Sequence, residues 1–64
     1  MNRRALERRL RRHGCLFHHH GGRHDVWINP ENQAKAPVPR HPRLKKGTAR
    51  GICRILGIPL PSNL

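Results

Sequence analysis

Hydrophobic positions along this chain follow either the period of a helix or the period of a strand, and the helical period predicts two helices. Leu6 and Leu10 fall at helical spacing, Asn2 is a suitable N-cap, and Gly14 is a suitable C-terminal stop, so we expect a helix over residues 3–13. The same spacing returns near the end of the chain and predicts a second helix that Gly57 ends, with apolar residues at Ala49, Ile52, Cys53 and Leu56.

The segment between the two helices has the character of strands and turns. Residues 15–20 and 24–29 are separated by Gly21-Gly22, which is typical of a hairpin turn, so these two runs should pair antiparallel. The turn sequence of residues 29–32 then precedes a third expected strand at residues 33–38. Pro37 lacks a backbone N–H and therefore places this third strand at the edge of the sheet.

The order helix, three strands, helix predicts an α+β fold in which two helices pack on one face of a three-stranded antiparallel sheet. This is the arrangement of double-stranded-RNA-binding domains, and residues 1–64 are long enough for a single such domain with a small core. Trp27 is the core member that the pattern supports least. The other expected core residues are Leu6, Leu10, Phe17, Val26, Ile28, Val38, Ile52, Leu56 and Ile58.

Charge restricts the classes of partner. The chain has 14 Lys and Arg against 3 Asp and Glu, a formal net charge of +11, and the basic residues extend from Arg3 to Arg54. A polyanion is the natural partner of such a chain. No apolar stretch approaches the ~18 residues of a membrane-spanning helix, and no secretory signal is recognisable, so we expect a cytoplasmic protein. The spacing of Cys15 and Cys53 fits neither a disulfide framework nor a metal motif, so both are expected to be partly buried thiols.

Metal chemistry is not favoured by these residues. Two-metal nucleases hold their ions with several carboxylates, whereas this chain has only Glu7, Asp25 and Glu31, which are scattered. In a regular strand His18 and His20 would project to one face and His19 to the other, so the three histidines could not share one ion. We expect no metal and no cofactor, although a histidine-rich metal carrier is one of the alternative functions.

Five short motifs occur in order along nearly the whole chain, and together they resemble HicA toxins, the small messenger-RNA interferases of HicA–HicB type II toxin–antitoxin systems. The motifs are His13-Gly14-Cys15, Gly21-Gly22-Arg23-His24, Val26-Trp27-Ile28-Asn29-Pro30, Val38-Pro39-Arg40-His41 and Lys46-Gly47-Thr48-Ala49-Arg50. The resemblance implies an endoribonuclease toxin that acts in stress responses and is inhibited by a HicB-like antitoxin protein.

By the resemblance, the catalytic role falls on His24. RNA carries its own nucleophile, the ribose 2′-hydroxyl, so one histidine among cationic groups can support cleavage without a metal. The family has serine or asparagine before this histidine, whereas this chain has Arg23, which could instead hold the scissile phosphate. Gly22, Arg23 and His41 are the possible supporting residues, and His41 is the candidate for a second acid or base.

Binding of RNA is assigned to basic residues outside the first helix. Lys45, Lys46 and Arg50 flank the start of the second helix, where free N–H groups and the helix dipole favour phosphate. Lys35 and Arg40 complete the expected RNA-binding set. The alternative function is a non-catalytic RNA-binding module, in which the same cations bind RNA and nothing is cleaved.

Overall fold

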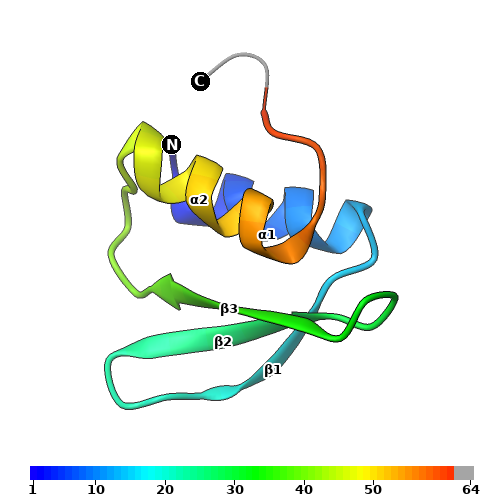
Figure 1. Cartoon of the computed structure of the whole chain (residues 1–64). Coiled ribbons are helices and arrows are strands. Elements are labelled where there is room, and N and C mark those ends of the chain that lie inside the picture. The colour runs from blue at the N-terminus through cyan, green and yellow to red at the C-terminus, as the bar shows by residue number, and fades with distance from the viewer. Residues whose placement is uncertain (62–64) are drawn as a thin grey trace.

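The elements follow the expected order in a computed structural model of the chain, which describes residues 1–61 (Figure 1). Their bounds are α1 Arg3–Arg12, β1 Leu16–His20, β2 His24–Asn29, β3 Ala34–Pro39 and α2 Lys46–Leu56. The α+β fold class and all five expected elements are therefore confirmed, and no expected bound differs from the observed one by more than one residue. The last residues of the expected domain, 62–64, lie outside the described residues.

Both helices begin and end for the reasons that the sequence supplies. The Asn2 side chain caps α1 by accepting hydrogen bonds from the N–H groups of Arg4 (2.7 Å) and Ala5 (3.3 Å). Gly14 follows α1 with φ 86°, and Gly57 ends α2 with φ 72°, a left-handed conformation that glycine adopts without strain. A Cβ at position 57 would also lie 2.8 Å from Asn32 Nδ2, so this C-terminus packs closely against the turn between β2 and β3.

The three strands form one antiparallel sheet with the order β1-β2-β3. The expected hairpin of β1 and β2 is confirmed, and so is the edge position of β3, where Pro37 is tolerated. The expected strict alternation of His18, His19 and His20 is wrong, because the register between β1 and β2 shifts between Phe17 and His19. Such a bulge inserts an extra residue and breaks the period of two.

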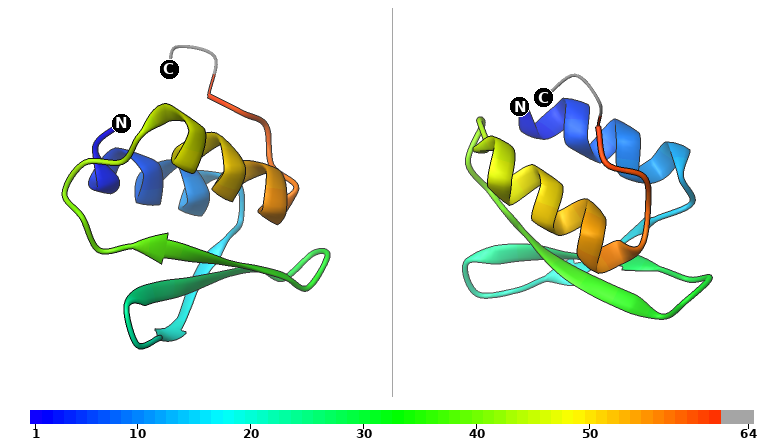
Figure 2. Two further views of the ribbon diagram at one scale, coloured as in Figure 1. Left: turned by 60° about the vertical axis from the view of Figure 1, so that its left-hand side comes forward. Right: turned by 45° about the horizontal axis from the view of Figure 1, so that its top comes forward.

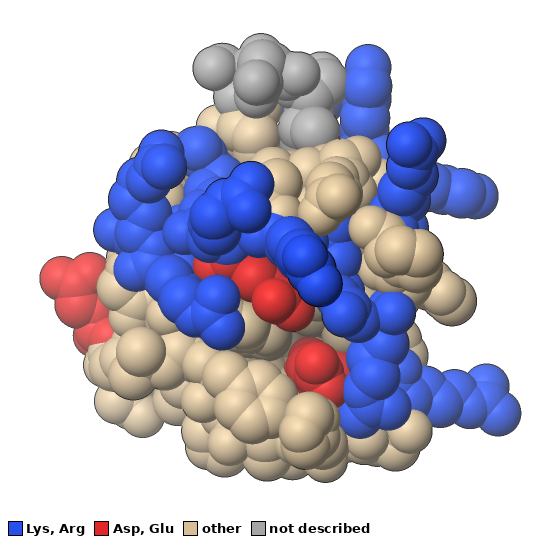
Figure 3. Space-filling view, turned by 180° about the vertical axis from the view of Figure 1, so that it is seen from behind, with Lys and Arg blue, Asp and Glu red and all other residues tan. Residues whose placement is uncertain are grey.

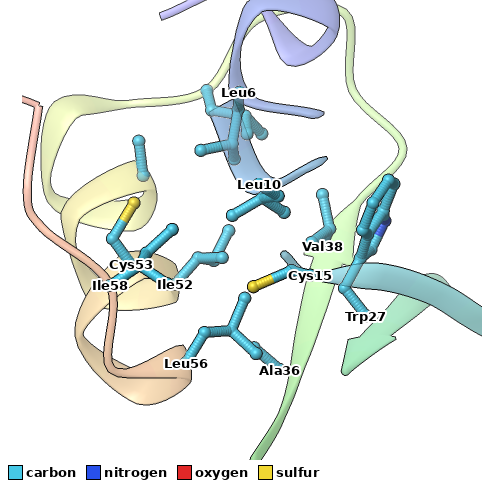
Figure 4. Close-up of a cluster of buried hydrophobic side chains, with 12 residues drawn as sticks. Leu6, Leu10, Cys15, Trp27, Ala36, Val38, Ile52, Cys53, Leu56 and Ile58 are labelled. Carbon is cyan, nitrogen blue, oxygen red and sulfur yellow. The ribbon is translucent and has the colours of Figure 1, made fainter. Parts of the chain in front are cut away.

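The helices lie together on one face of the sheet and leave the other face uncovered (Figures 1 and 2). Between the layers, Cys15, Leu10 and Leu56 meet the sheet residues Trp27 and Ala36 (Figure 4). The full set of buried hydrophobic residues is Leu6, Leu10, Cys15, Trp27, Ala36, Val38, Leu44, Ala49, Ile52, Cys53, Leu56 and Ile58.

Three expected core residues are assigned wrongly, two of them because β2 presents the opposite face to the helices and Phe17 because it lies on an edge strand. Trp27 is 1% exposed, whereas Val26 and Ile28 are only half-buried on the uncovered face. Adjacent residues of a strand point to opposite faces, and an indole buries more apolar surface than a valine or isoleucine side chain. Phe17 lies opposite Trp27 on edge strand β1 and stays 43% exposed.

Cys15 and Cys53 are free thiols with no exposed surface, so the expectation of partial burial is also wrong. Both belong to the cluster of buried apolar side chains (Figure 4). Burial raises the pKa of both thiols, because the thiolate form loses its hydration there. Within residues 1–61, no helix is both long and apolar enough to span a membrane.

The start of the chain is joined to the segment that precedes α2. Met1 and Leu44 exchange two hydrogen bonds of 2.7 Å, and the N–H of Arg3 donates to the carbonyl of Pro42 (3.0 Å). The first turns of α1 and α2 therefore lie at one end of the molecule, and the turn between β1 and β2 lies at that same end (Figure 1). We call this end the hairpin end.

Candidate functional site

The turn between β1 and β2 is closed by a short backbone hydrogen bond. The N–H of Gly21 donates to the carbonyl of His24 over 2.7 Å, which leaves Gly22 and Arg23 exposed at the tip. A Cβ at position 21 would lie 2.7 Å from that carbonyl oxygen, so a glycine is required there by the close approach. Position 22 has open space around it, and the close approach does not extend to Gly22.

His24 is the first residue of β2 and is exposed. Side chains alternate between the two faces along a strand, and Trp27, three positions further along β2, is buried under the helices. His24 therefore lies on the face of the sheet that the helices leave uncovered. Among the residues that the structure describes, the His24 imidazole has no hydrogen-bond partner. Both ring nitrogens are therefore open to a ligand.

Asp25 projects to the other face and holds a compact polar cluster. One of its carboxylate oxygens, Oδ1, accepts a hydrogen bond of 2.9 Å from Arg40 Nε and lies 2.9 Å from His20 Nδ1. These hydrogen bonds, the one from Arg40 first, hold the pKa of Asp25 below its ordinary value. Asp25 is therefore ionised throughout the neutral range.

Arg40 follows β3 and reaches back across the turn that precedes His24. Its Nη2 donates to the carbonyl of Gly21 over 2.7 Å, and its Nη1 approaches the carbonyl of Gly22 at 3.4 Å. The carbonyl of Arg40 in turn accepts a 2.7 Å hydrogen bond from Arg3 Nη1 in α1. The guanidinium of Arg40 thus contacts both sides of the turn, and the backbone carbonyl of Arg40 connects this segment to α1.

The remaining RNA-binding candidates fall into two groups. Lys45 and Lys46 are exposed at the hairpin end, and Arg50 is exposed one turn further along α2. Lys45 is the N-cap of α2, and no side chain among the described residues caps this helix. Lys35 lies opposite Ile28 and therefore shares the uncovered face with His24, but it lies toward the other end of β2.

His41, the expected second acid or base, is exposed in the segment after Arg40. The structure thus brings Gly22, Arg23 and His24 together with Arg40 around one turn. His41 is the next residue after Arg40 but makes no hydrogen bond to this cluster within residues 1–61.

Positive charge covers much of the helical layer. Seen from behind, Lys and Arg side chains spread over the upper part of the molecule and down the side that corresponds to the hairpin end, whereas the sheet side is mostly uncharged (Figure 3). Neither helix has an acidic residue in its first turn. The positive ends of both helix dipoles therefore add to the charge of the basic side chains, because no carboxylate in the first turns neutralises them.

The histidines of β1 are engaged with their neighbours. His18 and His19 contact each other through their Nδ1 atoms, and His20 contacts Asp25. In the part of the chain that the structure describes, no group of three His, Cys, Asp or Glu side chains is placed to hold a metal ion.

Asp25 and Arg3 are the residues of this site that the sequence patterns did not single out. A signal for Asp25 was present, because a chain with 14 basic and 3 acidic residues is expected to pair each carboxylate. Arg3 gave no such signal, because its contact with Arg40 joins residues 37 positions apart.

A family model described as the HicA toxin of bacterial toxin–antitoxin systems matches residues 3–58, which is nearly the whole chain. Searches of curated proteins and of solved structures give no match.

Proposed function

The chain belongs to the HicA toxin family of bacterial toxin–antitoxin systems, and from this premise we propose that it is a metal-independent endoribonuclease that cleaves messenger RNA at His24. The observation that carries the proposal is an exposed histidine whose imidazole has no hydrogen-bond partner within residues 1–61 and which follows Arg23 directly after a closed turn. In this proposal the single domain of residues 1–64 both binds the RNA and cuts it.

The proposed reaction uses the RNA's own nucleophile. The ribose 2′-oxygen forms a bond to phosphorus, the bond from phosphorus to the 5′-oxygen breaks, and the products are a 2′,3′-cyclic phosphate and a 5′-hydroxyl. His24 takes the proton of the 2′-hydroxyl or supplies a proton to the leaving 5′-oxygen. Arg23 stabilises the additional negative charge that develops on the phosphate oxygens. His41 is the proposed partner for the other proton transfer.

Phosphate binding is assigned to the hairpin end and to the start of α2. Lys45, Lys46 and Arg50 are exposed there, and the first N–H groups of an uncapped helix are available to phosphate oxygens. Lys35 extends the cationic surface along the face of His24. Because each neutralised phosphate releases counterions, the affinity for RNA should fall steeply with salt.

The carboxylates of the chain support a mechanism without a metal ion. Asp25 is engaged by Arg40 and His20, and Glu7 lies 3.7 Å from Arg3. Glu31, the third acidic residue, lies in the turn between β2 and β3, away from the hairpin end. The three carboxylates are separated, and Asp25 and Glu7 are engaged by cations, which does not suit the several carboxylates that a two-metal site requires.

The proposed partner is a HicB-like antitoxin in the cytoplasm. A surface with a formal charge of +11 is complementary to an acidic protein, and charge complementarity accelerates association and selects partners. Inhibition requires the antitoxin to cover His24 and the cations of the hairpin end. A complex that blocks cleavage while His24 remains open to solvent would contradict this proposal.

The decisive experiment compares the purified chain with its His24→Ala variant on a defined single-stranded RNA in excess EDTA. We expect His24→Ala to lower the cleavage rate by about 100-fold or more, because general acid–base catalysis contributes about that much. His18→Ala is the matched control, since it removes another exposed imidazole outside the turn. Linear 3′-hydroxyl ends would contradict the mechanism. Binding without cleavage by the parent chain would favour the RNA-binding module.

A further inference from the structure

The position of His24 depends on the backbone of its turn. Its imidazole has no hydrogen-bond partner among the described residues, so no side chain fixes the ring from outside. What defines the site of the ring is the path of the chain through Gly21 and Gly22 into β2. A group that holds this path therefore controls where His24 is presented.

Arg40 makes contacts on both sides of that path. Before the tip, its guanidinium donates to the carbonyl of Gly21 (2.7 Å) and approaches that of Gly22 (3.4 Å). After the tip, it donates to the carboxylate of Asp25 (2.9 Å), the residue that follows His24. The acceptors thus bracket Arg23 and His24 in the sequence.

We propose that Arg40 is a positioning residue, whose guanidinium keeps the turn closed and thereby fixes the location of His24, and that it is not primarily an RNA contact. This inference rests on the proposed function of His24. It changes the role expected from the sequence, in which Arg40 was grouped with the RNA-binding residues.

The role requires an arginine specifically. A guanidinium has five N–H donors in a rigid plane and can bond to a carboxylate and to carbonyls at the same time. A lysine ammonium at position 40 has the same charge but concentrates its donors on one nitrogen. It could reach Asp25 or the carbonyl of Gly21, but it could not reproduce the spread of contacts across the turn.

The support behind Arg40 is also defined by the structure. Its carbonyl accepts a hydrogen bond of 2.7 Å from Arg3 Nη1, which ties position 40 to the first turn of α1. Pro39 precedes it and restricts the backbone there. Arg40 thus links the helical layer, through its carbonyl, to the turn, through its guanidinium. An RNA phosphate could use it fully only by displacing these internal acceptors.

The test measures the single-turnover cleavage rate and the RNA affinity of the Arg40→Lys variant separately. We expect the rate at saturating protein to fall about tenfold or more, since a displacement of about 1 Å at a reacting group can cost about 100-fold. RNA affinity, measured in a His24→Ala background, should change by no more than about twofold, because the charge is kept.

Two control variants separate the possible roles. His20→Ala removes an exposed imidazole from Asp25 but leaves the contacts of Arg40, so we expect the rate to stay within about twofold of the parent. Arg40→Ala removes charge as well as geometry. If Arg40 were an RNA contact, Arg40→Lys would keep its cleavage rate and Arg40→Ala would mainly lose affinity and salt dependence, and that result would overturn the proposal.

A readout without cleavage keeps this inference separate from the proposed function. The Gly21 N–H closes the turn, so its hydrogen exchange reports turn opening directly. If the parent chain cleaves no RNA, the proposed function fails, but faster exchange at Gly21 in Arg40→Lys would still support the closure of the turn by Arg40. Unchanged exchange at Gly21 would overturn it in either case.

Discussion

Replacement of Trp27 by alanine should remove most of the stability of this protein. Trp27 is 1% exposed, packs edge-on to Phe17 with 6.2 Å between ring centroids, and lies under the guanidinium of Arg11 at 5.0 Å. Truncation of a buried tryptophan costs about 3–5 kcal/mol. A chain of this length has a total free energy of unfolding of about 3–10 kcal/mol. At the middle of both ranges the variant keeps about 2–3 kcal/mol, which is less than half of the parent's free energy of unfolding.

Two matched variants test whether the loss comes from the face that Trp27 occupies. Trp27→Phe keeps an aromatic ring and removes an indole N–H that is buried without a partner among the described residues, so its cost should be less than half that of Trp27→Ala. Ile28→Ala truncates the neighbouring residue on the uncovered face and should cost about 1 kcal/mol.

Urea unfolding followed by far-ultraviolet circular dichroism measures these differences. With a slope of about 1 kcal/mol per molar urea, a cost of about 3 kcal/mol lowers the midpoint by about 3 M. The packing argument is refuted if Ile28→Ala destabilises the protein more than Trp27→Ala does. That order would mean that β2 turns its other face to the helices.

Two further predictions concern polar contacts. The pKa of Asp25 is lower in the folded protein than its ordinary value of 3.8. Its hydrogen bonds therefore stabilise the fold fully at any pH above 3.8, and this stabilisation is lost as the pH falls through the folded-state pKa. Thermal unfolding between neutral and acidic pH should therefore show a shallower decline for Asp25→Asn than for the parent, and superimposable profiles would contradict it. Asn29 is 5% exposed and donates from Nδ2 to the carbonyl of Leu56 over 2.7 Å, at the end of α2. Asn29→Ala should cost about 1–3 kcal/mol in urea unfolding, more than Asn32→Ala, because Asn32 is exposed; equal costs would show that burial of the amide is unimportant.

The sequence alone determined the order and type of the elements. Helical spacing, the Asn2 cap and the glycines at positions 14 and 57 act between near neighbours, so their effects can be read without knowing the fold. The same is true of the edge position of β3, because a missing N–H at Pro37 is a local property. The catalytic role of His24, taken from a short motif that resembles the HicA family, stays a prediction.

Only the tertiary structure decided which face of β2 is buried and which groups Arg40 contacts. Val26, Trp27 and Ile28 are all apolar, so alternation along the strand is compatible with either face, and the choice depends on how the helices pack around the indole. Arg40 reaches Asp25 because β3 pairs with β2 in a register that places Pro39 opposite His24. Such contacts between distant positions depend on strand register and layer packing, which no local pattern in the sequence contains.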